Sequence, residues 1–79
     1  MQFYDIVQDA ATNKGIAMDR IGLAMGRSSS YISAARSRGS LPKVDNAAEI
    51  LDVCGYVLCA IPKDAAPKNA MIVDAHERS

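Results

Sequence analysis

The sequence has no tryptophan, one phenylalanine and one histidine among its 79 residues. Its apolar residues, which make up 49% of the chain, are mostly Ala, Ile, Val, Leu and Met. This composition favours a helical fold over a β-sandwich and is too apolar for a disordered chain. A chain of this length forms one domain with a small core, and such domains are often stabilised as dimers.

Several kinds of site and segment are missing as well. No apolar run approaches the ~20 residues that span a bilayer, and the acidic N-terminus is unlike a secretory signal. The C-x4-C spacing of Cys54 and Cys59 matches no common zinc-ligand pattern, so we expect two buried thiols in a reducing cytoplasm. His76 lies in the polar tail, and no acid pair or nucleophile stands out. We therefore expect no enzyme, no metal, no cofactor, no membrane partner and a cytoplasmic location.

The formal net charge of zero hides a strong asymmetry along the chain. The window from Lys14 to Lys43 holds six basic residues and one acid, Asp19, so it carries +5 and the rest carries −5. Such asymmetry indicates a polyanionic partner. Alternatively, these are ordinary solvated charges, or the arginines pair with acids of the fourth helix such as Asp45 or Glu49.

The apolar spacing predicts four helices, over about residues 3–12, 17–25, 29–37 and 43–54. Glycines placed just after helical segments act as stop signals, and Ser28 is a good N-cap for the third helix. Ile16, in the turn between the first two helices, is expected to pack into the core. The predicted core-facing residues are Phe3, Ile6, Val7, Ala10, Ile21, Ala24, Met25, Ile32, Ala35, Val44, Ala47, Ala48, Ile50, Leu51 and Cys54.

The pattern of residue types changes after Gly55. Residues 56–62 are rich in β-branched and aromatic side chains and end at Pro62, which predicts a strand. A second apolar run at 70–73 follows a turn-like segment of about seven residues, so the two runs predict a β-hairpin. One hairpin is marginal alone and needs a helix or a second chain to pack on. Residues 75–79 are expected to fray.

Residues 17–37 have the layout of a helix-turn-helix, in which the second helix enters the major groove of DNA. Gly22 allows the two helices to approach closely, and Gly26 makes the tight turn between them. The order Ile21, Gly22, Met25, Gly26 and then an isoleucine six residues later resembles the lambda-repressor/Cro-like family, also called XRE-type. The stretch from Pro42 to Gly55 resembles the helix that follows the motif in that family.

The resemblance implies which residues meet DNA, although three positions depart from the family pattern. Met18 stands where the family often has Gln, Ala17 stands where it often has Ser or Thr, and Arg36-Ser37-Arg38-Gly39 replaces Glu-Arg-Gly. The base-reading positions carry over to Ser28, Ser29, Ser30, Ser33, Ala34 and Ser37. The expected phosphate contacts are Arg20, Arg27, Tyr31, Arg36, Arg38 and Lys43. Hydroxyls can donate to or accept from several base edges, and Ala34 can touch a thymine methyl.

The implied organisation is a DNA-binding domain over residues 1–56, a dimerisation hairpin over 57–74 and a tail over 75–79. The expected dimer contacts are Tyr56, Val57, Leu58, Cys59, Ile61, Met71, Ile72 and Val73. Alternatively, the hairpin folds back on its own helices in a monomer. The expected function is that of a transcriptional regulator, with repression the default, that binds a palindromic operator in double-stranded DNA as a homodimer. The alternatives are an antitoxin that also binds a toxin, and a protein-interaction module with this fold but no DNA binding.

Overall fold

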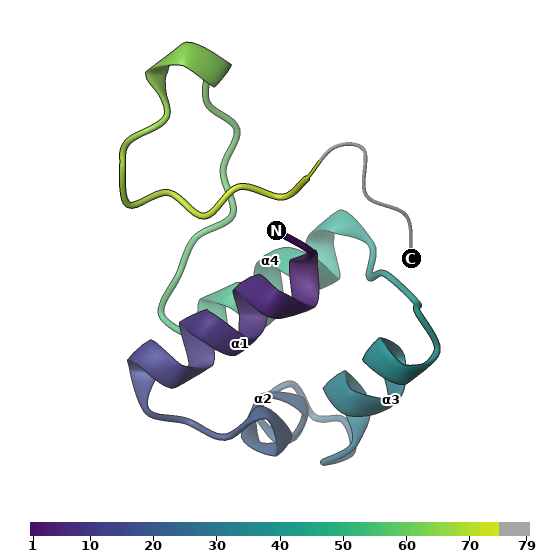
Figure 1. Cartoon of the computed structure of the whole chain (residues 1–79). Coiled ribbons are helices and arrows are strands. Elements are labelled where there is room, and N and C mark those ends of the chain that lie inside the picture. The colour runs from purple at the N-terminus through teal and green to yellow at the C-terminus, as the bar shows by residue number, and fades with distance from the viewer. Residues whose placement is uncertain (75–79) are drawn as a thin grey trace.

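The computed structural model of the chain describes residues 1–74, and within them the fold is mainly helical (Figure 1). Its elements are α1 (Phe3–Lys14), α2 (Met18–Ala24), α3 (Tyr31–Ser37), α4 (Val44–Val53) and a short 3₁₀ helix, η1 (Lys63–Ala65). Helices α1 and α4 lie side by side, and α2 contacts both α3 and α4. The four predicted helices are therefore confirmed, with ends that shift by one or two residues.

The core lies where the helices meet, and the helical spacing located most of it. Val7 and Ala10 of α1 have no exposed surface, nor does Ile21 of α2. The other buried apolar residues are Phe3, Tyr4, Ile6, Ala11, Ile32, Ala35, Ala47, Ile50, Leu51 and Cys54. Ile16 and Met25 pack against this core and are partly buried, as predicted.

Two predicted core positions are exposed, and a third, Ala48, is only partly buried and lies outside the core cluster. Val44 is 76% exposed because it is the first residue of α4 and precedes the turn that reaches the core. Ala24 is exposed at the last position of α2. Helical periodicity gives the direction in which a side chain points, but it does not show how far along a helix the neighbouring elements extend.

All four helices end in the same way, at a glycine with positive φ: +79° at Gly15, +74° at Gly26, +66° at Gly39 and +78° at Gly55. After each glycine, the next backbone N–H reaches back to a carbonyl in the last turn. At Gly26, for example, Arg27 N donates to Gly22 O at 2.8 Å. This left-handed ending satisfies carbonyls that the helix leaves free, and a side chain would strain it. The glycine stop signals are confirmed.

The start of α3 differs from the prediction. Helix α3 begins at Tyr31 and not at Ser29, and its N-cap residue is Ser30, whose side chain makes no capping bond. The carbonyl of Ser28 instead accepts the N–H of Tyr31 at 3.2 Å, which closes a turn over residues 28–31. Ser28 is therefore not the N-cap, because this turn occupies the position where the sequence suggested helix.

The predicted β-hairpin is absent from the described residues. Residues 57–61 run without a strand partner, η1 occupies part of the intended turn, and residues 72–74 bond to the backbone of Met1. An isolated two-stranded hairpin is marginal in water, and the backbone of Ile72 and Asp74 in and after the second run is engaged by Met1. Residues 75–79, which were expected to fray, lie outside the described part of the chain.

The segment after α4 separates the residues that were predicted to dimerise. Tyr56 and Met71 pack against the core of their own chain, and the Tyr56 hydroxyl accepts a hydrogen bond from Asn13 Nδ2 at 2.9 Å. Val57, Leu58, Cys59, Ile61, Ile72 and Val73 are exposed. Cys54 is buried as expected, whereas Cys59 is exposed because it lies where the chain leaves the core.

No helix within residues 1–74 is long and apolar enough to cross a membrane.

Alkaline pH is expected to destabilise the fold. Burial raises the pKa of Tyr4 above its ordinary 10.0, with a further increase from Tyr31 and an opposing effect of Arg38. Burial also raises the pKa of Cys54 above 9.0. Since both groups ionise more readily in the unfolded chain, they leave the free energy of unfolding unchanged below about pH 9 and lower it at higher pH.

Urea unfolding at several pH values between 7 and 11 tests this expectation. The Tyr4 hydroxyl donates to Ser40 O at 2.6 Å, so Tyr4→Phe should cost some stability at pH 7. The same variant should lose less stability than the wild type above pH 10. If the free energy of unfolding of the wild type rose between pH 9 and 11, the predicted direction of the pH dependence would be wrong.

Candidate nucleic-acid interface

The packing of α2 on α3 positions the candidate site. Gly22 of α2 is buried, and a Cβ added there would lie 2.9 Å from Tyr31 Cβ and closer still to the Ser28 carbonyl oxygen. The two helices thus meet at a distance that only glycine permits. On the other side of α3, Ile32 and Ala35 are buried in the core. Together these contacts fix which face of α3 looks outward.

That outward face carries the serines. Ser28, Ser29, Ser30, Ser33 and Ser37 are all exposed, and Ala34 is half-buried among them. The hydroxyls of Ser28 and Ser30 lie 3.2 Å apart, and the Ser33 hydroxyl donates to Ser30 O at 3.2 Å. The structure therefore gathers the six predicted base-reading positions on α3 and the turn before it. All six side chains are short, and five of them are exposed hydroxyls.

Arg27 and Tyr31 lie beside these serines. The Arg27 guanidinium sits 4.7 Å from the centre of the Tyr31 ring, a cation–π distance that holds the arginine near the start of α3. Tyr31 is half-buried and packs against the core. Arg27 is exposed and forms no ion pair with any of residues 1–74, so its charge is available to an anion.

Arg36 has a different environment from the one predicted. Its Nη2 lies 2.6 Å from Asp5 Oδ1, and its Nη1 donates to Gln8 Oε1 at 2.9 Å, both on α1. Arg36 therefore pairs with an acid of α1, and not with Asp45 or Glu49 of the fourth helix as the alternative prediction had it. This contact joins α3 to α1 and leaves the guanidinium engaged by its own chain.

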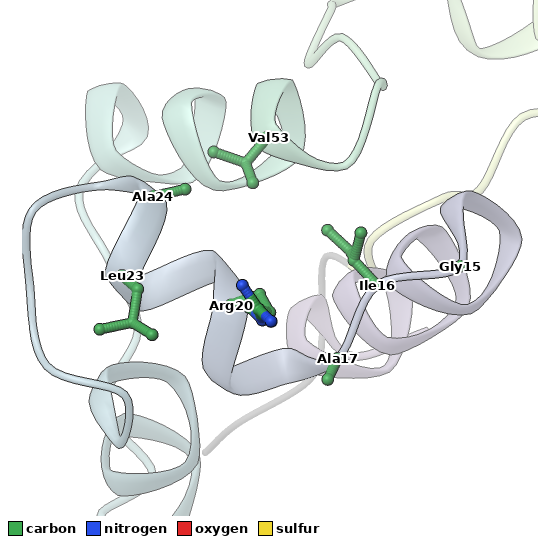
Figure 2. A pocket seen from close by; sticks show the side chains of 7 residues that line it. All are labelled: Gly15, Ile16, Ala17, Arg20, Leu23, Ala24 and Val53. Atoms are coloured by element: carbon green, nitrogen blue, oxygen red, sulfur yellow. The ribbon is translucent and has the colours of Figure 1, made fainter.

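Arg20 lies away from the serines of α3. It lines a shallow groove between α2, the α1–α2 turn and α4, where Figure 2 shows it near Ile16 and Val53. The other residues of the groove are Gly15, Ala17, Leu23 and Ala24. The predicted phosphate contact of Arg20 therefore belongs to a different surface from that of Arg27.

Arg38 and Lys43 are both exposed, on either side of the loop that joins α3 to α4. Arg38 is the residue that follows α3, and Lys43 is the N-cap residue of α4. Neither forms an ion pair within the described part of the chain. Arg27 precedes the serines in the chain and Arg38 follows them, and neither charge is paired within the described residues.

Asp5 and Gln8 are the residues that sequence reasoning missed. The apolar stripe of α1 showed that both lie off the core face, but nothing in the spacing indicated that they meet Arg36. The contact between Arg36 and Asp5 spans 31 residues along the chain, and only the tertiary fold brings the two side chains together.

Among residues 1–74 no three His, Cys, Asp or Glu side chains gather in a way that could hold a metal ion. Comparison of the chain with protein-family models, with curated proteins and with solved structures finds no match.

Proposed function

We propose that the protein is a sequence-specific DNA-binding transcriptional regulator that acts as a homodimer, with repression of its target as the expected mode. The observation that carries this proposal is the outer surface of α3. Ser33 and Ser37 are exposed on α3, Ser28, Ser29 and Ser30 are exposed in the turn before it, and the unpaired charges of Arg27 and Arg38 lie before and after them in the chain. Serine is an indifferent helix former, so helix stability gives no reason for Ser33 and Ser37 on the outer face of α3.

In the proposed complex, α3 enters the major groove and α2 crosses the backbone, as in other helix-turn-helix proteins. Short hydroxyl side chains allow the helix to lie deep in the groove. Each hydroxyl can donate to or accept from a base edge, and Ala34 offers a methyl group to thymine. Such contacts discriminate less sharply than bidentate arginine, so DNA shape is expected to contribute to the choice of site.

The phosphate contacts are assigned by which charges are free. Arg27 and Arg38 lie before and after α3, Lys43 begins α4, and none of them forms an ion pair inside the described chain, so they supply the proposed clamp. Arg36 is assigned the role of a positioning residue, because Asp5 and Gln8 already occupy its guanidinium. Arg20 is left out because its groove lies on another surface. In the proposed homodimer, two copies of α3 would read half-sites about one DNA turn apart.

The test is a fluorescence-anisotropy titration against DNA from upstream of the protein's own gene, at several salt concentrations. The affinity should fall steeply as salt rises, because phosphate contacts release counterions. Arg27→Ala/Arg38→Ala should flatten the log–log slope by about 0.9 for each lost phosphate contact.

Arg36→Ala is the control to set beside the single variants Arg27→Ala and Arg38→Ala, since each of the three removes one positive charge at or next to α3. It should leave the salt slope close to the wild-type value while lowering thermal stability slightly, because exposed ion pairs contribute at most about 1 kcal/mol. No binding to any duplex at low salt would overturn the proposal. If Arg36→Ala flattened the salt slope as much as the loss of a phosphate contact does, the assignment of Arg36 as a positioning residue would be overturned.

A second candidate function is suggested by the exposed apolar residues after α4. Val57 is 79% exposed and Ile72 is 60% exposed, which fits binding of another protein. In this second candidate, the protein is an antitoxin that represses its own operon. It would bind DNA through α3, as in the first proposal, and would bind a toxin through the segment after α4. A toxin gene beside this one, together with co-purification of its product, would favour that form. A protein-interaction module without DNA binding is what remains if the titration fails.

A further inference from the structure

The groove that holds Arg20 takes no part in the proposed DNA contact. Its lining is apolar apart from Arg20 and comes from the α1–α2 turn, α2 and α4. Leu23 is 53% exposed, and Ile16 and Val53 are half-buried. The other lining residues are glycine or alanine, whose small size leaves the groove open. Figure 2 shows Arg20 between Leu23 and Ile16, so a single charge lies among aliphatic side chains that the core does not cover.

Two basic side chains make this groove and its edge positive. Arg20 is exposed and forms no ion pair with any of residues 1–74. Lys14 ends α1, and its side chain lies against Gly55, where an added Cβ would be 3.6 Å from Lys14 Nζ. This amine therefore lies beside the end of α4 that lines the groove, and it also forms no ion pair in the described chain. The acids next in sequence, Asp19 and Asp52, do not line the groove. A complementary partner carries carboxylates beside an apolar contact.

The backbone around the groove favours a helical partner over an extended one. Helices and a turn border the groove, and residues 1–74 contain no strand whose edge could add another. In the turn, Gly15 N and Ile16 N both donate to Ala11 O, at 2.9 and 3.0 Å. An extended segment would leave its own backbone groups without partners here, whereas a helix bonds its backbone internally.

A second copy of this chain does not supply such a helix. Within the described residues, the apolar stripes of α1, α3 and α4 are buried in their own core, through side chains such as Val7, Ile32 and Ile50. After α4 the described chain is helical only at η1, which has three residues. The occupant is therefore a helix from a different protein.

We propose that this groove binds an acidic amphipathic helix of another protein. An aliphatic side chain of that helix packs against Leu23 and Ile16, and a carboxylate one turn away pairs with Arg20. A further carboxylate faces Lys14 at the edge of the groove. Because Arg20 and the serines of α3 lie on different surfaces, this contact goes beyond the proposed DNA binding and does not depend on it.

A synthetic helical peptide serves as the probe. It carries leucines at i, i+3, i+4 and i+7 and glutamates at the positions beside them. Titrated into the isotope-labelled full chain, it should shift the amide signals of Ile16, Leu23 and Val53 in NMR spectra. The amide signals of Ser28 and Ser33 should stay in place, because those residues lie on the α3 surface.

Variants at exposed positions test which side chains hold the peptide. Arg20→Ala should weaken peptide binding about tenfold, because it removes a charge-assisted contact. Leu23→Ala should weaken it about fivefold through the lost apolar contact. Arg27→Ala is the matched control: it removes the same charge from the serine surface and should weaken binding less than about twofold, because salt screens distant charges. Arg20→Glu should prefer a peptide in which lysines replace the glutamates. Circular dichroism should be the same for all these proteins.

No shift of the groove signals at about 1 mM peptide would overturn this proposal. Shifts confined to residues 57–61, or equal losses for Arg20→Ala and Arg27→Ala, would do the same. Groove signals that move with protein concentration before any peptide is added would make the occupant a second copy and overturn the assignment to another protein. DNA titrations on the same samples separate the two proposals. Peptide binding without DNA binding overturns only the proposed function, and DNA binding without peptide binding overturns only the groove.

Discussion

Gly22→Ala is expected to lower the free energy of unfolding by about 2 kcal/mol, although alanine is the better helix former. The added Cβ would meet the Ser28 backbone carbonyl and lie 2.9 Å from Tyr31 Cβ. A backbone carbonyl cannot rotate away as a flexible side chain can, so α2 and α3 must move apart. At about 4–8 °C per kcal/mol for a domain of this size, the midpoint of thermal unfolding should fall by roughly 10 °C.

The measurement is thermal unfolding followed by circular dichroism, beside Ala24→Ser as the control on the same helix. Ala24 is exposed, so its substitution should change stability by no more than about 0.5 kcal/mol. If the proposed function holds, Gly22→Ala should also weaken DNA binding at temperatures where it remains folded, because the position of α3 changes. A Gly22→Ala protein as stable as the wild type would show that the helices do not need this close approach.

Val7→Ala and Val44→Ala are expected to differ strongly, although both remove two methyl groups and both positions fit the predicted core stripes. Val7 has no exposed surface and Val44 is 76% exposed. Truncation of Val7 loses about 0.8 kcal/mol for each buried carbon and leaves a cavity, so a loss of about 2–3 kcal/mol is expected. Val44→Ala should stay within about 0.5 kcal/mol of the wild type.

The free energies of unfolding of the two variants are measured by urea unfolding. The dependence of this free energy on urea concentration should stay close to that of the wild type. Since native domains are stable by only about 5–15 kcal/mol, the loss at Val7 would be a large part of the total in so small a domain. Equal losses at the two positions would mean that Val44 is buried in solution. That result would favour the sequence pattern over the structure at this residue, and it would indicate a partner covering the start of α4.

The serines of α3 show how far the candidate site could be read from the sequence. Their outward direction followed from the burial of Ile32 and Ala35 on the opposite side of the helix, which periodicity predicted. The close approach at Gly22 followed from the absence of a side chain. The partner of Arg36 could not be predicted, because Asp5 lies 31 residues earlier and is brought to it only by the packing of α1.

Arg20 and Arg27 carry the same charge in the same motif, yet they face different surroundings. Arg27 lies over the Tyr31 ring beside the serines, and Arg20 lines the groove near Ile16 and Val53. The net charge summed over residues 14–43 includes both arginines and does not distinguish their surroundings. The separation of the two appears only when α4 is placed against α2.

The sequence by itself determined the four helices, their glycine ends and most of the core, because helical periodicity and capping depend on residues within a turn or two. Only the tertiary structure decided which charges stay free, that Val44 is exposed, and that residues 72–74 meet Met1 and not residues 57–61. Each of these depends on contacts between residues far apart in the chain. Their free energy is set by packing of whole elements, which no local pattern records.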